Sequence, residues 1–93
     1  FFGVPAATLL GSAQLAARAR ARVFVLWSRR EADGSYFVQV EPAWPGWEQA
    51  EPAQAAATYM RALEQKVREA PEQYLWVHRR FKTRPPGEPS LYA

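Results

Sequence analysis

Cysteine is absent from this chain, and histidine and methionine occur once each, at His78 and Met60. Without cysteine the chain can form neither a disulfide framework nor a thiolate metal site. A lone histidine also argues against a structural zinc site, which draws its ligands from histidine and cysteine. We therefore predict no metal site and no cofactor in these residues.

Long apolar runs and a strong excess of one charge are lacking too. No stretch approaches the roughly 18 apolar residues that a membrane-spanning helix needs, and no signal peptide is visible. The formal net charge is +3, from ten arginines and two lysines against nine acidic residues. This excess is small and dispersed among acids, which argues against nucleic acid as a partner. Arginine does suit bidentate binding of phosphate and carboxylate groups.

The length of the chain allows one small domain. With 93 residues, such a domain buries only about 60% of its unfolded surface, so a missing neighbouring layer has a large effect. Phe1 stands first where a complete chain would carry methionine. We expect the sequence to be part of a longer protein.

The first half of the chain predicts a helix followed by a hairpin. Thr8 can cap a helix that runs to about residue 20 and is rich in alanine and leucine. Residues 22–30 are apolar on both alternating faces, which is typical of a buried strand. Asp33-Gly34 is a hairpin turn signal. A second strand follows over residues 36–41, in which Tyr36 and Val38 share one face.

The second half predicts two helices. Pro52 favours a helix start, and apolar residues recur at helical spacing up to Ala70. Pro71 ends that helix and begins a shorter one through Phe81, with His78 on an aromatic face, before an extended tail. The order is α-β-β-α-α. Two antiparallel strands are rarely stable alone, so we predict an α/β fragment that completes a larger sheet.

Two segments of the sequence resemble bacterial lipid A lauroyl and myristoyl acyltransferases. Residues 1–8, FFGVPAAT, are similar to the segment after the central strand of those enzymes. Residues 71–85, PEQYLWVHRRFKTRP, are similar to their C-terminal signature. Order and spacing agree over all 93 residues. The resemblance implies a glycerolipid-acyltransferase-like fold, with residues 1–93 as the C-terminal part of a single acyltransferase domain whose catalytic half lies upstream.

The resemblance also implies an activity. The family moves a fatty acyl chain from acyl carrier protein to a hydroxyl of a lipid A precursor, a phosphorylated glycolipid, at the cytoplasmic face of the bacterial inner membrane. Its base is a histidine followed, after a four-residue gap, by an acidic residue. Here Thr83 stands five positions after His78. We therefore assign no catalytic residue, expect His78 to be a packed structural histidine, and expect the chain alone to be inactive.

Candidate substrate-binding residues fall into three groups. The aromatic and glycine turn near the start could line the acyl groove, since glycine lets the backbone approach a ligand closely. A basic pair ends the first strand, where α/β folds gather their sites. A basic cluster near the end suits phosphates or the acidic carrier protein. The candidates are Phe2, Gly3, Arg29, Arg30, Arg79, Arg80 and Lys82. For each group the alternative is packing or solvated charge.

Other functions stay open on the sequence alone. A relative could acylate another phospholipid or glycolipid acceptor. The chain could also be a non-catalytic module whose basic aromatic segment binds an anionic lipid. Trp44, Trp47 and Tyr92 could sit at a membrane surface, but we expect the tryptophans to pack within the proline-rich segment 42–52.

Overall fold

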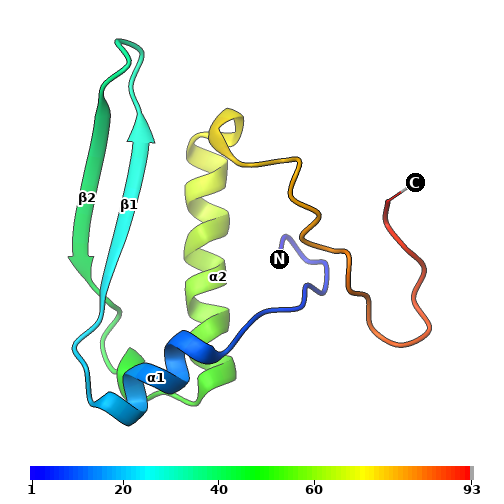
Figure 1. Cartoon of the computed structure of the whole chain (residues 1–93), viewed down its shortest axis with the longest axis horizontal. Coiled ribbons are helices and arrows are strands. Elements are labelled where there is room, and N and C mark those ends of the chain that lie inside the picture. Colours follow the sequence, from blue (N-terminus) through cyan, green and yellow to red (C-terminus); the bar gives the residue numbers. More distant parts are fainter. Residues whose placement is uncertain (93) are drawn as a thin grey trace.

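The structure is a computed structural model that describes residues 1–92. Its elements are α1 (Gly11–Ala19), β1 (Phe24–Arg30), β2 (Tyr36–Pro42), the 3-10 turn η1 (Trp47–Gln49), α2 (Pro52–Glu69) and the 3-10 turn η2 (Pro71–Gln73). Helix α2 stands at the centre of the molecule, with the β1–β2 hairpin on one side and both terminal segments on the other (Figure 1). Helix α1 crosses beneath them.

Helix α1 begins later than the sequence suggested. Its N-cap position is Leu10, which offers no side-chain cap. The Thr8 hydroxyl instead donates a hydrogen bond to the carbonyl of Ala6 at 3.0 Å. The prediction that Thr8 caps the helix is therefore wrong, because its hydroxyl is used within the preceding turn. The helix ends where Arg20 adopts a left-handed conformation, with φ of 49°.

The predicted hairpin and its turn are confirmed. Strands β1 and β2 pair antiparallel, from Phe24 opposite Pro42 to Arg30 opposite Tyr36. Between them the Asp33 carboxylate accepts hydrogen bonds from the hydroxyl and the backbone amide of Ser35, at 2.6 and 2.9 Å. These bonds favour the charged carboxylate, so they hold the pKa of Asp33 below its ordinary value.

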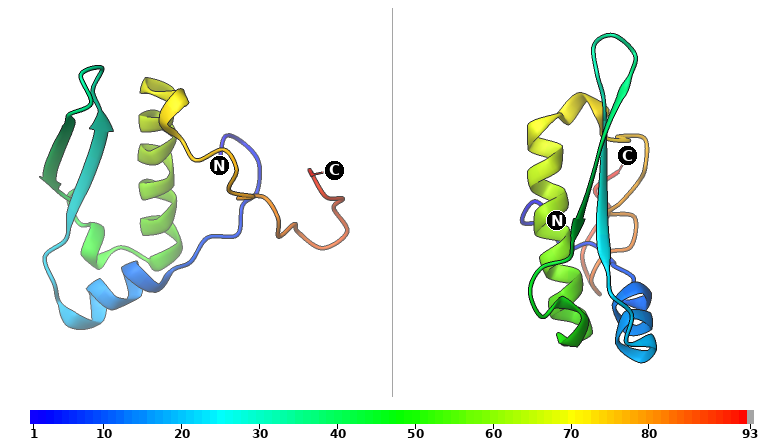
Figure 2. Two further views of the ribbon diagram at one scale, coloured as in Figure 1. Left: turned by 45° about the horizontal axis from the view of Figure 1, so that its top comes forward. Right: turned by 90° about the vertical axis from the view of Figure 1, so that its left-hand side faces the viewer.

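The two faces of the hairpin differ in what covers them. Directly paired residues point to the same face, so Val25, Trp27 and Arg29 share one face with their partners on β2. Helix α2 runs alongside this face (Figure 2), and Tyr59 of α2 stacks on Trp27 with ring centroids 6.1 Å apart. The opposite, outer face carries five apolar side chains that are all more than half exposed: Phe24, Leu26, Tyr36, Val38 and Val40. The strand that we expected to be buried is exposed there, because α2 covers only one face.

The most buried residues lie where α1, η1 and α2 meet. Trp47 is buried against Ala13 and Ala16 of α1 and Ala55 of α2. Its indole Nε1 donates to the carbonyl of Ala55 at 2.9 Å. Alanine side chains are small enough for three backbones to approach one indole ring. The expectation that Trp47 packs in the core is confirmed.

A carboxylate links η1 to the chain just before β1. Glu48 accepts a hydrogen bond from the backbone amide of Val23 at 3.1 Å. That bond favours the ionised carboxylate and lowers the pKa of Glu48. The carbonyl of Val23 in turn accepts from the amide of Ala43 at 2.9 Å. Both ends of the hairpin are thereby held close to the buried tryptophan.

Helix α2 follows its predicted course from Pro52 to Glu69. The Glu51 carboxylate caps it by accepting from the amide of Gln54 at 3.2 Å. Val67 is its most buried large side chain. Neither helix within residues 1–92 is long and apolar enough to cross a membrane.

The second C-terminal helix is largely absent. The helix expected over residues 71–81 is limited to η2, and residues 74–81 form a series of turns. Leu75, Trp76 and Val77 are 66, 63 and 83% exposed. A short helix gains most of its stability from packing an apolar face, and these side chains find no layer to pack against. His78 is exposed as well, so the prediction of a packed histidine on a helical face is wrong.

Candidate functional site

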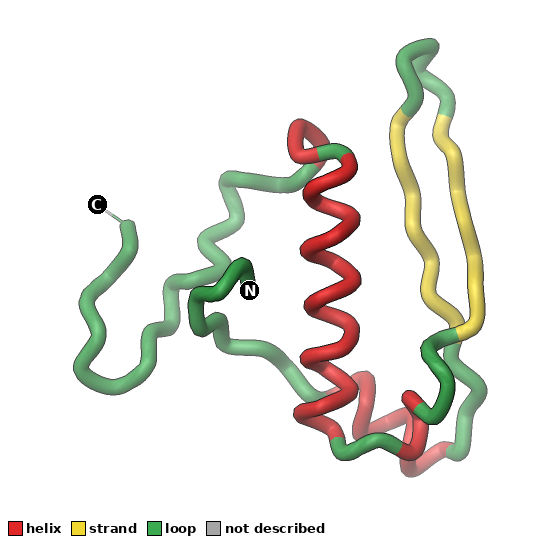
Figure 3. Tube along the Cα trace, turned by 180° about the vertical axis from the view of Figure 1, so that it is seen from behind, coloured by secondary structure: helices red, strands yellow, loops and turns green. Residues whose placement is uncertain are grey.

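The candidate residues lie on both sides of α2. The β1–β2 hairpin, in which β1 ends with Arg29 and Arg30, lies on one side of α2, and the N-terminal segment lies on the opposite side with the C-terminal segment (Figure 3). Among the candidates from the two ends of the chain, Arg80 reaches the N-terminal turn. The structure therefore brings the predicted residues together as two separate groups, with a helix between them.

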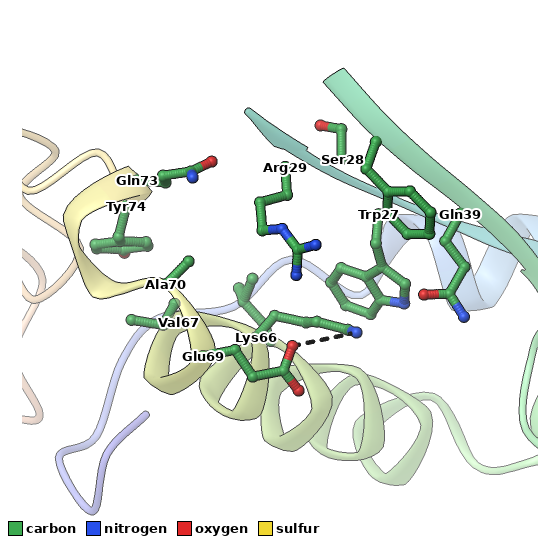
Figure 4. A pocket seen from close by; sticks show the side chains of 12 residues that line it. Trp27, Ser28, Arg29, Gln39, Lys66, Val67, Glu69, Ala70, Gln73 and Tyr74 are labelled. Carbon is green, nitrogen blue, oxygen red and sulfur yellow. Dashed lines mark ion pairs between the residues drawn. The ribbon is translucent and has the colours of Figure 1, made fainter. Parts of the chain in front are cut away.

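On the hairpin side, a cleft of about 200 Å³ opens between β1–β2 and the last turns of α2 (Figure 4). Its wall is aromatic and apolar, from Trp27, Phe37 and Val67, and two cations reach into it. The Arg29 guanidinium lies 5.6 Å from the ring centre of Phe37, and the Lys66 ammonium lies 5.6 Å from that of Trp27. The cleft suits a small ligand with an apolar part and an anionic part.

Both cations of this cleft also have carboxylate partners. Arg29 is 3.0 Å from Glu31. Lys66 is 3.4 Å from Glu69, and a dashed line marks this pair in Figure 4. The Arg29 side chain is 51% exposed, so its ion pair contributes about 1 kcal/mol at most. An incoming phosphate or carboxylate could therefore replace Glu31 at little cost. Arg29 keeps its place as a candidate on this geometry.

Arg30 is tied to the C-terminal segment through its backbone. Its amide donates to Gln73 Oε1 and its carbonyl accepts from Gln73 Nε2, both at 2.9 Å. A side-chain amide thus takes the position that a neighbouring strand would take. The pair is 43 residues apart in sequence, so no local pattern could have indicated Gln73.

On the other side of α2, the N-terminal turn has an unusual backbone. Phe2 has a positive φ of 51° and Gly3 one of 76°. Glycine accepts this conformation freely, whereas any other residue is destabilised by about 1–2 kcal/mol. The amide of Phe2 donates to Glu64 Oε1 at 2.6 Å. A hydrogen bond to a charged group contributes about 1.5–3 kcal/mol, which offsets the strain at Phe2.

Arg68 completes the cluster around this turn. Its guanidinium lies 4.7 Å from the ring centre of Phe2 and 3.7 Å from Glu64. The two residues form an i,i+4 ion pair along α2, and the Glu64 side chain is only 19% exposed because it faces the turn.

Arg80 is part of the scaffold around the N-terminal turn. Its Nε donates to the Tyr74 hydroxyl at 2.7 Å, and its guanidinium lies 4.7 Å from the ring centre of Phe1. Arg84, from the same basic cluster, donates to the carbonyl of Pro5 at 2.9 Å. It also forms an ion pair with Glu88, and its side chain is 10% exposed. Arginine from the C-terminal segment therefore holds the turn at two points.

Arg79 and Lys82 differ from Arg80 in their surroundings. Both are exposed. The Arg79 guanidinium lies 5.7 Å from the ring centre of Tyr92, whose hydroxyl accepts from the amide of Phe81 at 3.0 Å. These two cations can meet an anionic ligand without breaking a buried contact. Within residues 1–92, no group of three or more acidic or histidine side chains could hold a metal ion.

Known proteins are similar in sequence to nearly the whole of this chain. The family described as bacterial lipid A biosynthesis acyltransferase matches residues 1–83. The chain belongs to this family. It is 44% identical to the lipid A biosynthesis palmitoleoyltransferase of Escherichia coli K12 over 94 aligned positions, which cover 99% of this chain and 30% of that protein. It is 40% identical to the lauroyltransferase of the same organism, over 94% of this chain and 29% of that protein.

A more distant member of the lipid A acyltransferase family comes from Haemophilus influenzae. It is 35% identical over 95% of this chain and 27% of its own length. The chain thus spans less than a third of the length of these relatives. The two segments that first indicated the family, residues 1–8 and 71–85, meet in the structure through the Arg80–Phe1 and Arg84–Pro5 contacts.

Proposed function

We propose that this chain is the C-terminal part of an acyltransferase that moves a fatty acyl chain from acyl carrier protein to a hydroxyl of a lipid A precursor. The observation that carries the proposal is the family match over residues 1–83. Relatives named as palmitoleoyl- and lauroyltransferases of lipid A biosynthesis support it. The chain spans about 30% of their length, so the remainder of the whole protein supplies the base.

The proposed place of the chain is within a larger α/β sheet of the glycerolipid acyltransferase type. The exposed outer face of the hairpin supports this, because apolar side chains gain little stability until another layer covers them. The edge of β1 supports it as well. The backbone N–H and C=O groups of Arg30 point toward Gln73 and away from β2. Because the direction of these groups alternates along a strand, the backbone N–H and C=O groups of Ser28 and Leu26 also point away from β2, along the free edge of β1. A further strand can pair there.

In this proposal the chain binds and positions substrates, and it does not take the proton. The acceptor hydroxyl attacks the acyl thioester carbonyl, a base from the rest of the protein removes the hydroxyl proton, and the carrier thiol leaves. The Phe2–Gly3 turn contributes to the acyl groove. Arg29, Arg79 and Lys82 are exposed cations that can meet phosphate groups of the acceptor or acidic residues of the carrier protein.

The proposed location is the cytoplasmic face of the bacterial inner membrane. The acceptor is a lipid, so the protein has to work at a membrane surface. Exposed Leu75, Trp76 and Val77 lie beside the cations Arg79 and Lys82. Apolar side chains next to basic ones favour contact with an anionic bilayer surface.

The direct test is an acyl-transfer assay with the whole protein that carries this sequence. Acyl carrier protein loaded with twelve-, fourteen- or sixteen-carbon chains serves as donor, and a tetra-acylated lipid A precursor serves as acceptor. We expect mass spectrometry to show one added acyl chain on the precursor. A lysophospholipid is the control acceptor, and transfer to it in preference to the precursor would contradict the proposed acceptor.

The exposed cations should act on binding more than on folding. Replacing Arg79 and Lys82 together by alanine in the whole protein should raise the KM for the precursor about ten- to thirtyfold, since each juxtamembrane cation contributes about 1 kcal/mol. Tm should change little.

Arg80→Ala should instead lower the free energy of unfolding by about 1–2 kcal/mol, because it removes a hydrogen bond and a cation–π contact.

Arg61→Ala is the matched control, since Arg61 is an exposed cation on α2. It should change neither KM nor Tm. An unchanged KM in the Arg79 and Lys82 double variant would remove these residues from the binding surface.

A further inference from the structure

One side of α2 contacts the Phe2–Gly3 turn directly. Glu64 and Arg68 lie one helical turn apart, and Val67 beside them is buried. Glu64 contacts the turn through the backbone amide of Phe2, and Arg68 contacts it through the ring. Because buried Val67 holds this part of α2 in place, Glu64 and Arg68 offer the turn a fixed set of contacts.

The contact to Glu64 is made where the backbone is strained. Phe2 has a positive φ, and a residue other than glycine keeps such a conformation only when its surroundings hold it. The amide of Phe2 points at Glu64 Oε1 over 2.6 Å. Losing this acceptor frees Phe2 to return to an ordinary conformation, which also redirects the neighbouring Gly3.

Glu64 could instead serve only as the ion-pair partner of Arg68. Two observations argue against that simpler role. The contact to Phe2 is shorter than the 3.7 Å contact to Arg68. The Glu64 side chain is also turned away from solvent, at 19% exposure. An ion pair with Arg68 alone would not require this burial, because i,i+4 pairs also form on the exposed surface of a helix. The group that Phe2 contacts at this position is an acceptor oxygen.

We propose that Glu64 is a positioning residue that holds the Phe2–Gly3 turn and, through that turn, the donor acyl chain. The inference rests on the proposed function, in which this turn contributes to the acyl groove. Arg68 covers the Phe2 ring and keeps it against the helix. Glu64 touches neither the thioester nor the hydroxyl, so its loss changes which acyl chain is accepted more than it changes the chemistry.

The test uses Glu64→Ala and Glu64→Gln in the whole protein. Glutamine keeps an oxygen that can accept from the Phe2 amide, and alanine does not. The first readout is the ratio of kcat/KM for twelve-carbon and sixteen-carbon donors. The second is hydrogen exchange at the amides of residues 2–4, which does not depend on activity. Glu72→Ala is the control, because Glu72 is an exposed carboxylate in η2.

We expect Glu64→Ala to change the selectivity ratio about tenfold, as a small displacement of a groove wall does, and to speed exchange at residues 2–4. Glu64→Gln should return the ratio to within about threefold of the original protein. Equal losses on all donors, or faster exchange without any change of selectivity, would overturn the positioning role.

The two proposals fail in different ways. If the unaltered protein transferred no acyl chain, the proposed function would fall, and the exchange experiment would still decide whether Glu64 holds the turn. Faster exchange in Glu64→Ala alone would support that contact. Equal exchange in all variants would overturn it.

Discussion

The isolated 93-residue chain should transfer no acyl chain above background under conditions in which the whole protein is active. Acyl transfer to a hydroxyl needs a base to take the proton. The sequence holds one histidine, His78, and the structure places it on an exposed turn between Leu75 and Arg79. The measurement is precursor acylation by mass spectrometry, with both proteins at equal concentration.

His78→Ala in the whole protein separates a missing base from a misfolded fragment. We expect its rate to stay within about twofold of the original, as for an exposed residue outside the reacting groups. A large loss of rate in this variant, with unchanged Tm, would mean that His78 takes part in the chemistry. Activity of the isolated chain would lead to the same conclusion.

Trp47→Ala should be the most destabilising single substitution in this region. The indole fills the space between α1, η1 and α2, and its Nε1 donates to the carbonyl of Ala55. Its removal should lower the free energy of unfolding by about 3–5 kcal/mol, from the cavity and the lost packing together. Urea unfolding of the whole protein, followed by circular dichroism, measures this difference.

Two further variants show which part of the tryptophan matters. Trp47→Phe keeps a ring and loses the N–H that donates to the carbonyl of Ala55, so its cost should be smaller, at about 0.5–1.5 kcal/mol for the lost hydrogen bond. Trp76→Ala is the control, because Trp76 is 63% exposed and its removal leaves no buried cavity; the loss of its hydrogen bond to the carbonyl of Pro71 should cost about 1 kcal/mol. Equal losses for Trp47→Ala and Trp76→Ala would contradict the assigned core.

The local elements were predictable because their signals are local. The Asp33-Gly34 turn, the alternation in β2 and the start of α2 at Pro52 each depend on a few neighbouring residues. The helix expected over residues 71–81 failed for a different reason. Its apolar spacing fits a helix, but helix formation there needs a packing layer, and Leu75 and Val77 remain exposed.

The candidate site was predictable in its residue types and less so in their roles. Exposed cations such as Arg29 and Arg79 were found because charge is visible in the sequence. Glu64 and Gln73 were not assigned their contacts, since these join residues 62 and 43 positions apart. Arg80 was predicted from its charge alone, and its contacts with Phe1 and Tyr74 could not be, because aromatic rings from two distant segments converge on it.

The contact between Arg84 and Pro5 bears on where a stable unit of this protein stops. The family match ends at residue 83, whereas the bond from Arg84 reaches back across 79 residues to the beginning of the chain. A truncation after residue 83 would remove Arg84 and release the opening turn. Fusion partners or affinity tags at the C-terminus therefore need a spacer beyond Glu88, the ion-pair partner of Arg84.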